Sequence, residues 1–173
     1  MKELFLVQAL AGAWANDILS AELARLDLAQ WTAQSAVNFC SMQGIANHLL
    51  LADRLWLHRL TGEGEALASV AAVPCPDVAD FVAARREEDA RVTAFVRGLD
   101  PARLGQTLHF RTIDGTPKAL PYFLCVAHFL NHQTHHRGQL HALLGAQGIA
   151  CPDIDLMYSP AARELAAPGA PGA

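Results

Sequence analysis

The sequence predicts an all-α protein, a four-helix bundle with one short β-hairpin before the last helix. Four long segments carry apolar residues at helical spacing, and three of them end at a glycine. The one stretch with strand character, around residues 107–116, is too short to form a central sheet. Helices that each bury one apolar stripe therefore have to pack against one another, which favours a bundle.

The first helix is expected over residues 4–25, and the second is signalled at both ends. The stripe of the first helix that we expect to turn inward comprises Leu6, Leu10, Trp14, Ile18 and Leu19. A connection of mixed polar and apolar residues is expected after it. Ser41 can cap the second helix, because a serine hydroxyl accepts a hydrogen bond from the first turn. This helix is expected to run to about Leu60, where Thr61 and Gly62 stop it.

A crossover segment precedes the third helix. Residues 67–76 are rich in alanine and proline, which is typical of an irregular connection. Asp77 is expected to cap a third helix that reaches Arg97 and ends at Gly98. The inward face of this helix is expected to comprise Val78, Phe81, Val82, Val92 and Phe95.

A hairpin and a long last helix complete the predicted bundle. Residues 107–113 have strand-forming composition, and Asp114-Gly115 is typical of a tight turn because glycine adopts positive φ without steric cost. The last helix is expected to begin at Ala119 or Pro121 and to continue to Gln147, just before a glycine.

The length of 173 residues predicts one domain. Residues 1–150 are expected to form the bundle domain, and residues 151–173 a C-terminal tail. From Pro152 onward the tail leads into repeated alanine, proline and glycine, which cannot bury enough surface to offset their ordering entropy. We therefore expect the tail to be disordered, above all at its end.

Charge and composition argue against several classes of partner. The net charge is −4, and the 13 lysines and arginines are scattered, so nucleic-acid binding is disfavoured. Apolar runs are broken by charges such as Asp53 and Arg54 before the roughly 20 residues that a membrane span needs. The first residues include Glu3 and lack a small-residue cleavage site. We expect a cytoplasmic protein with no membrane or nucleic-acid partner.

Histidines are concentrated in the last helix. Five of the eight lie between residues 128 and 141, namely His128, His132, His135, His136 and His141. His132 and His136 are one turn apart on the same helical face, so both imidazoles can bind one ion. His48 shares a helical face with apolar residues, which should direct it inward, where an unpaired imidazole would be costly. The sequence therefore predicts a divalent-metal site made of His48, His132 and His136.

The remaining histidines fit this site less well. His128 is expected either to neighbour the ligands or to bind at an open position, and His135 to lie at the surface or an interface. We interpret His141 as structural, and His58 and His109 as partly exposed and hydrogen-bonded.

All-histidine ligation suits zinc, nickel, iron(II), copper or manganese, of which zinc or nickel is favoured. Three protein nitrogens leave a position open for water or substrate, and the ion lowers the pKa of a bound water or thiol. The four cysteines form no C-x-x-C pair and are expected to be free thiols: Cys40, Cys75, Cys125 and Cys151. Cys125 is interpreted as a small buried hydrophobe, with a thiolate near the metal as the alternative.

Two segments carry a resemblance to a known family. The last helix contains NHQTHHRGQ (residues 131–139), and the second helix contains NHLLLADRLW (residues 47–56). With the hairpin before the last helix, these segments resemble the DinB family of metalloenzymes over nearly the whole chain. The resemblance implies an up-down-down-up bundle, usually a homodimer, with a metal on His48, His132 and His136. Relatives include thiol-dependent S-transferases and hydrolase-like proteins. Spacing assigns no role to Arg137 or Gln139.

The leading hypothesis is a metal-dependent enzyme, a thiol S-transferase or a hydrolase. It would activate water or a low-molecular-weight thiol for attack on a small-molecule substrate. The alternative is a non-catalytic dimeric bundle with a structural or sensory metal. A third reading is a metal-free bundle whose three histidines bond to protein partners.

Overall fold

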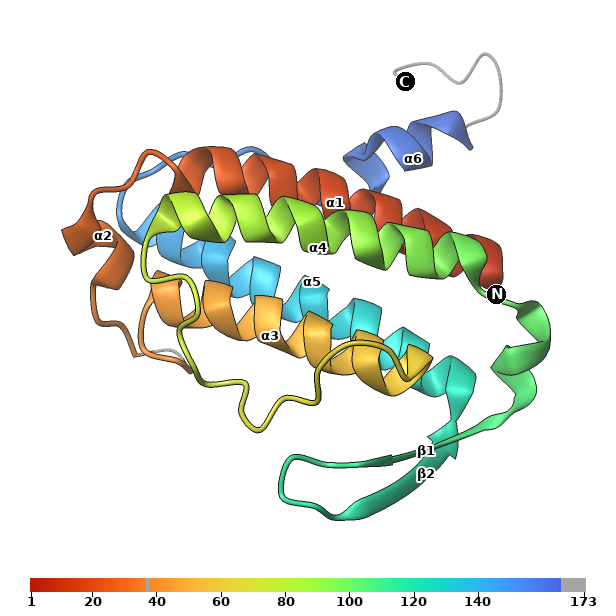
Figure 1. Ribbon diagram of the computed structural model, residues 1–173. Helices are drawn as coiled ribbons and strands as arrows, with labels where there is room; N and C mark the ends of the chain where they lie inside the picture. The colour runs from red at the N-terminus through yellow and green to blue at the C-terminus, as the bar shows by residue number, and fades with distance from the viewer. Residues whose placement is uncertain (37, 166–173) are drawn as a thin grey trace.

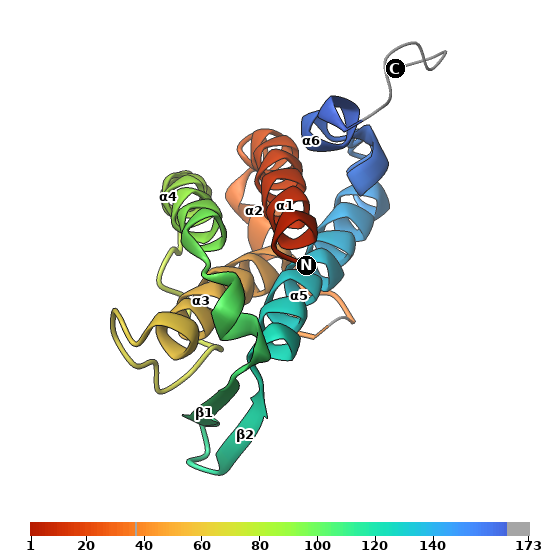
Figure 2. The same cartoon turned by 90° about the vertical axis from the view of Figure 1, so that its right-hand side faces the viewer.

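Four long helices lie alongside one another in the computed structural model, which describes residues 1–36 and 38–165 (Figure 1). They are α1 (Lys2–Leu23), α3 (Met42–Thr61), α4 (Val78–Gly98) and α5 (Tyr122–Ala146). α1 contacts both α4 and α5, and α3 contacts the same two helices. Viewed towards their ends, the four helices surround a shared interior (Figure 2).

The predicted ends of the second helix are confirmed in α3. The Ser41 hydroxyl accepts a hydrogen bond from the Gly44 N–H, and Gly62 follows the helix with a left-handed φ of 79°. Asp77 precedes α4 as expected, although its side chain makes no capping hydrogen bond. These two helices therefore follow local sequence signals closely.

The predicted hairpin is confirmed. Of the two predicted starts of the last helix, Ala119 is wrong, whereas Pro121 immediately precedes the helix as its N-cap residue. Strand β1 (Thr107–Arg111) pairs antiparallel with β2 (Pro117–Pro121), in a register that places Thr107 opposite Pro121. Because Ala119 belongs to β2, α5 begins only at Tyr122. The turn contains Gly115 with a φ of 83°, as the Asp-Gly pair indicated.

The face of α1 that points inward differs from the predicted stripe. Leu10, Trp14 and Ile18 are only partly buried. The side that faces the other helices includes Phe5, Ala9, Gly12, Asn16, Leu19 and Leu23. Asn16 is inside because its amide donates a hydrogen bond of 2.7 Å to the buried carboxylate of Asp89. A polar residue with a buried partner has thus turned the helix away from its most apolar stripe.

A short helix, α2 (Leu28–Thr32), occupies the connection between α1 and α3. Asp27 and Gln30 form a capping box, in which each side chain accepts a hydrogen bond from the other residue's backbone. Trp31 is buried at 1% exposure and donates its indole N–H to the carbonyl of Pro76. This tryptophan anchors α2 against the crossover segment.

The expectation of a disordered tail is wrong for residues 152–165. This segment contains a 3-10 turn, η2 (Leu156–Tyr158), and helix α6 (Pro160–Glu164), both in contact with α1. Ser159 is fully buried, and its hydroxyl caps α6 at the Ala162 N–H. Local capping and contact with α1 supply the order that composition did not indicate. The rest of the predicted tail, residues 166–173, lies outside the described residues.

By length and composition, α1 is also the one helix among the described residues that reaches the criteria for a membrane span, contrary to expectation. Of the 18-residue apolar stretch of α1, 44% is buried inside the protein. The buried side carries Asn16 and Ser20 and contacts α4 and α5. These contacts are those of a core helix.

A charged network lies buried between α1, α3 and α4. Arg85 donates a hydrogen bond of 2.7 Å to Asp53, and its other terminal nitrogen lies 2.9 Å from Asp89. Burial raises the pKa of Asp89 to about 6, although Arg85 opposes that shift. Asp53 and Arg85 are almost inaccessible to solvent, so each charge depends on its partner for compensation.

We predict that Asp53→Ala lowers the free energy of unfolding by about 3–5 kcal/mol, because it leaves the Arg85 guanidinium buried without its closest partner. Glu22→Ala removes an ion pair with the exposed Arg25 and should cost less than about 1 kcal/mol. Urea unfolding of both variants measures the difference. Equal losses would contradict a central role for the network.

Candidate metal centre

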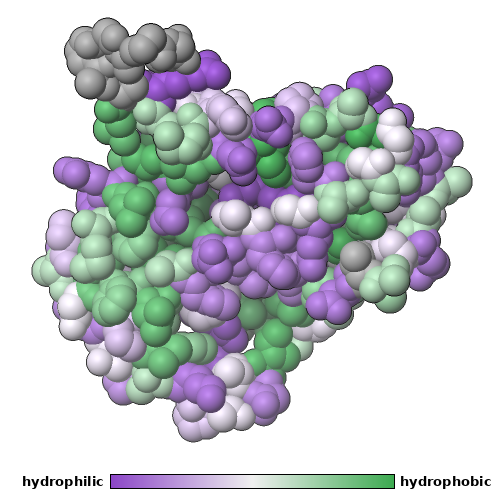
Figure 3. Space-filling model, turned by 180° about the vertical axis from the view of Figure 1, so that it is seen from behind, coloured by the Kyte–Doolittle hydropathy of each residue, from purple (hydrophilic) through white to green (hydrophobic). Residues whose placement is uncertain are grey.

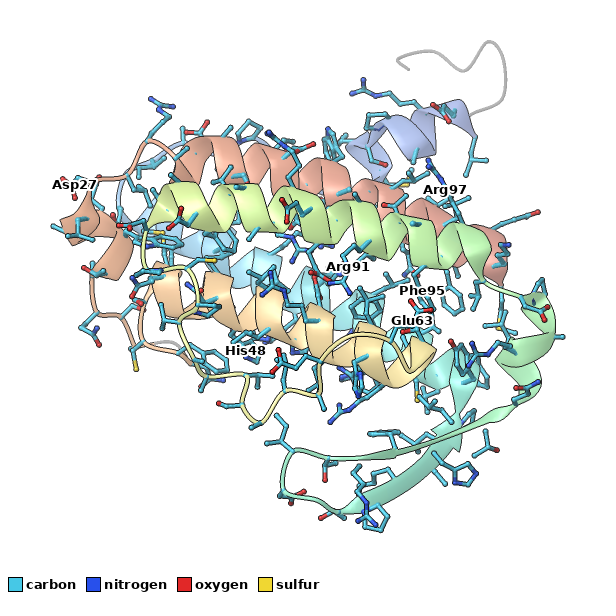
Figure 4. The ribbon with its side chains drawn as sticks, viewed as in Figure 1. Asp27, His48, Glu63, Arg91, Phe95 and Arg97 are labelled. Atoms are coloured by element: carbon cyan, nitrogen blue, oxygen red, sulfur yellow. The ribbon has the colours of Figure 1, made fainter. Side chains whose placement is uncertain are left out.

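Three imidazole rings from two helices meet on one side of the molecule. His48 comes from α3, and His132 and His136 come from α5, one turn apart. Their ligand nitrogens all lie within 4.8 Å of one another. The structure therefore brings together the three histidines that the sequence singled out. His48 lies on α3 beside the loop that follows this helix (Figure 4).

The spacing of the nitrogens suits a single ion. His132 Nε2 lies 3.1 Å from His136 Nε2 and 3.4 Å from His48 Nε2. Two imidazole nitrogens bound to one zinc ion at about 2.0–2.1 Å would be separated by roughly 3.0–3.4 Å at octahedral or tetrahedral angles. Two of the three nitrogen pairs therefore have the separation that a shared divalent transition metal requires.

Hydrogen bonds orient two of the rings with Nε2 towards the centre. His48 Nδ1 donates to the Val70 carbonyl at 3.0 Å, and His136 Nδ1 donates to Gln139 Oε1 at 2.8 Å. Because both partners accept, each Nδ1 carries the proton and each Nε2 keeps a free lone pair. His132 Nδ1 is buried and has no partner among the described residues.

The same surroundings keep these histidines neutral. Burial first, and then the neighbouring His136 and His48, lower the pKa of His132 to about 3. Burial also lowers the pKa of His136 to about 4, against an opposing effect of Gln139. The pKa of His48 is lowered chiefly by burial. Neutral imidazoles are the form that binds metal, so protons compete weakly for this site.

Phe39 covers one side of the centre, which the sequence analysis did not anticipate. Its ring stacks on His48 at a centroid distance of 3.8 Å and an interplanar angle of 18°. The backbone of Phe39 has a φ of 65°, a left-handed conformation that is unusual for a bulky residue. Gly44 permits it, because a Cβ at that position would lie 2.0 Å from the Phe39 carbonyl oxygen. Gly44, in the first turn of α3, was therefore the feature of the sequence that could have indicated the conformation of Phe39.

The other histidines lie outside the cluster. His128 is exposed, packs on Trp56 at 4.9 Å between ring centroids and lies 5.8 Å from His132. His135 is exposed as predicted, and Gln139 Nε2 donates to it, so that Gln139 links it to His136. His141 and His58 bond to the carbonyls of residues 152 and 63, and His109 is exposed on β1.

Cys125 and Arg137 have surroundings that indicate structural roles. Cys125 is 1% exposed in an apolar cluster, and burial raises the pKa of its thiol, which disfavours a thiolate. The expectation of a small buried hydrophobe is confirmed. Arg137 is buried and donates to Thr134 at 3.0 Å. Its guanidinium fits against Gly12, where a Cβ would lie only 3.3 Å away.

Comparison with known proteins finds a matching family and a solved structure of similar fold. The model of the DinB family matches residues 6–167. A crystal structure of a DinB-like protein from Bacillus cereus is similar in fold, with a TM-score of 0.62 over 81% of this chain and 90% of that chain. The two sequences are 20% identical. No curated protein matches the sequence.

We predict that the metal-free protein loses stability as the pH falls from 6.5 towards 4. The unfolded chain takes up protons on histidines of pKa near 6.5, whereas folded His132 and His136 have pKa values of about 3 and about 4. The double variant His132→Gln, His136→Gln should show a weaker pH dependence in urea unfolding. The matched variant His141→Gln should behave as the wild type. A pH profile shared by all three proteins would contradict the assignment.

We also predict that Gln139→Leu weakens metal binding about tenfold to a hundredfold, because His136 loses the acceptor that orients it. Competition with a chromophoric chelator measures the dissociation constant. Gln34→Leu changes an exposed glutamine elsewhere and should leave this constant unchanged. An unaltered constant in the Gln139 variant would show that the hydrogen bond does not support the site.

Proposed function

The chain belongs to the DinB family, and on this basis we propose that it is a metal-dependent enzyme, a thiol S-transferase or a hydrolase. It would activate water or a low-molecular-weight thiol for attack on a small electrophile. One observation carries the proposal: three Nε2 atoms converge, and hydrogen bonds at Nδ1 direct the lone pairs of two of them to a common point.

His48, His132 and His136 would hold a divalent ion, zinc or nickel in the first place. When bound, such an ion supplies Lewis acidity that lowers the pKa of water or a thiol. Val70 and Gln139 keep two of the rings oriented through their Nδ1 hydrogen bonds. Phe39 shields one face of His48 from water.

His128 would move a proton during the reaction. It lies one helical turn before His132 and is exposed, so it is accessible to a substrate at the centre. The part of its ring that packs against the protein is desolvated, and this partial burial, together with the nearby Arg59 charge, lowers its pKa, which keeps the imidazole neutral and able to accept a proton. This role requires no change in the metal ligands.

The alternative function is a non-catalytic bundle with a structural or sensory metal. The stacking of Phe39 on His48 favours it, because a covered ring suits a closed site. In that case chelation would lower the melting temperature strongly, and no substrate would turn over.

The assembly and location remain proposals as well. We propose that the long helices form an up-down-down-up four-helix bundle and that the protein is a cytoplasmic homodimer. The bundle is supported by the family and by the paired helix contacts. Hydrophobic residues gather towards one side of the back of the molecule, which supports pairing of two copies there (Figure 3).

We predict about one metal ion per chain in the purified protein, and its loss in the double variant His132→Ala, His136→Ala. Elemental analysis measures the content, and His141→Ala serves as a control outside the cluster. The loaded protein is then assayed with thiols plus electrophiles and with esters. Absence of metal after reconstitution would overturn the proposed site. Retained metal without any turnover would favour the non-catalytic alternative.

A further inference from the structure

A cavity lies between the C-terminal half of α3, the loop after it and strand β1. Its volume is about 380 Å³. The hairpin that forms one wall projects beyond the helices (Figure 2). None of the three clustered histidines lines this cavity. The cavity is therefore separate from the histidine cluster.

The polar side chains of this cavity are basic or neutral. Arg59, Arg111, His58 and His109 line it, and no aspartate or glutamate does. Among the described residues, neither Arg59 nor Arg111 forms an ion pair. The positive charge of this lining contrasts with the net charge of −4 of the chain as a whole. Such a lining suits an anionic ligand.

Arg59 is held in place before any ligand arrives. Its guanidinium carbon lies 4.9 Å from the centroids of both the Trp56 and Phe110 rings. One terminal nitrogen donates to the Arg111 carbonyl at 3.1 Å, and Nε is buried without a partner among the described residues. Because the side chain is already ordered, binding a carboxylate to its free edge costs little rotamer entropy.

A line of aromatic rings connects Arg59 to the histidine cluster. Trp56 lies 4.9 Å from the Arg59 guanidinium carbon and 4.9 Å from the His128 ring, and the His128 ring lies 5.8 Å from that of His132. Along α3, Arg59 follows His48 by eleven residues, or about 16 Å between α-carbons. A molecule that reaches from the centre to Arg59 therefore needs an extended apolar body.

We propose that this cavity binds a carboxylate of the substrate, so that the substrate is a thiol whose carboxylate lies several bonds from its sulfur. Arg59 binds the carboxylate, and Arg111 adds a second positive charge. The thiol end rests on the function proposed above, whereas the carboxylate end rests on the cavity alone.

The test compares 8-mercaptooctanoate with its neutral amide, 8-mercaptooctanamide. Binding of each to the cobalt-loaded protein is measured by thiolate-to-cobalt absorbance and by calorimetry. The wild type should bind the acid about tenfold more tightly than the amide, as expected for a charge-assisted hydrogen bond. Arg59→Gln should abolish this preference and Arg111→Gln should reduce it, with cobalt affinity unchanged in both.

Arg103→Gln is the matched control, because Arg103 also stacks on an aromatic ring, that of Tyr122, but does not line the cavity. Its preference for the acid should equal that of the wild type. No preference in the wild type, or one retained in both Arg59→Gln and Arg111→Gln, would overturn the carboxylate site.

Octanoate and octanamide, which lack sulfur, separate the two proposals. Octanoate binding that depends on Arg59, without any thiolate absorbance from the mercapto compounds, would support the carboxylate site and count against a thiol substrate. Thiolate absorbance without a preference for the acid would support thiol binding and refute the carboxylate site.

Discussion

The buried pairing of Asp53 and Asp89 with Arg85 is the interaction on which the arrangement of the helices depends. A charge in the protein interior is tolerated only with a partner, so α3 and α4 have to present these residues to each other. α1 joins them through Asn16. His48 precedes Asp53 by five residues, which turns it by about 140° around α3. The side of the helix opposite to the network thus carries His48, the candidate metal ligand of this helix.

Neighbouring residues of α5 face two different polar clusters, the charged network and the three histidines. Gln133 and Arg137 are buried towards the charged network, and burial lowers the pKa of Arg137 to about 10 although Asp53 and Asp89 oppose that shift. His132 and His136 each stand one position earlier and belong to the histidine cluster. This explains why the most polar stretch of α5 lies in the middle of the protein. Two sets of polar partners replace the usual apolar stripe.

Local signals in the sequence were sufficient to predict the ends of α3, the hairpin turn and the pairing of two histidines on α5. Ser41, Gly62 and the Asp-Gly turn act within a few residues of their own position, and the H-x-x-x-H pair follows from helical periodicity alone. The grouping with His48 needed a further argument, that a histidine on an apolar face needs a partner. Features set by distant contacts were missed. The face of α1 depends on Asp89, and the order of residues 152–165 depends on contact with α1. The left-handed Phe39 depends on how the chain enters α3, which composition does not encode.

His48 is far from His132 and His136 in the sequence, so the cluster is expected to form late in folding. His48 and His132 are 84 positions apart, so bringing them together closes a long loop and costs conformational entropy before any contact repays it. α3 alone contributes only one imidazole, that of His48, to the cluster. During synthesis, a nascent chain would therefore acquire high affinity for the ion only after α5 had left the ribosome and docked. Metal uptake would then mark completed tertiary structure and would stabilise it against reopening.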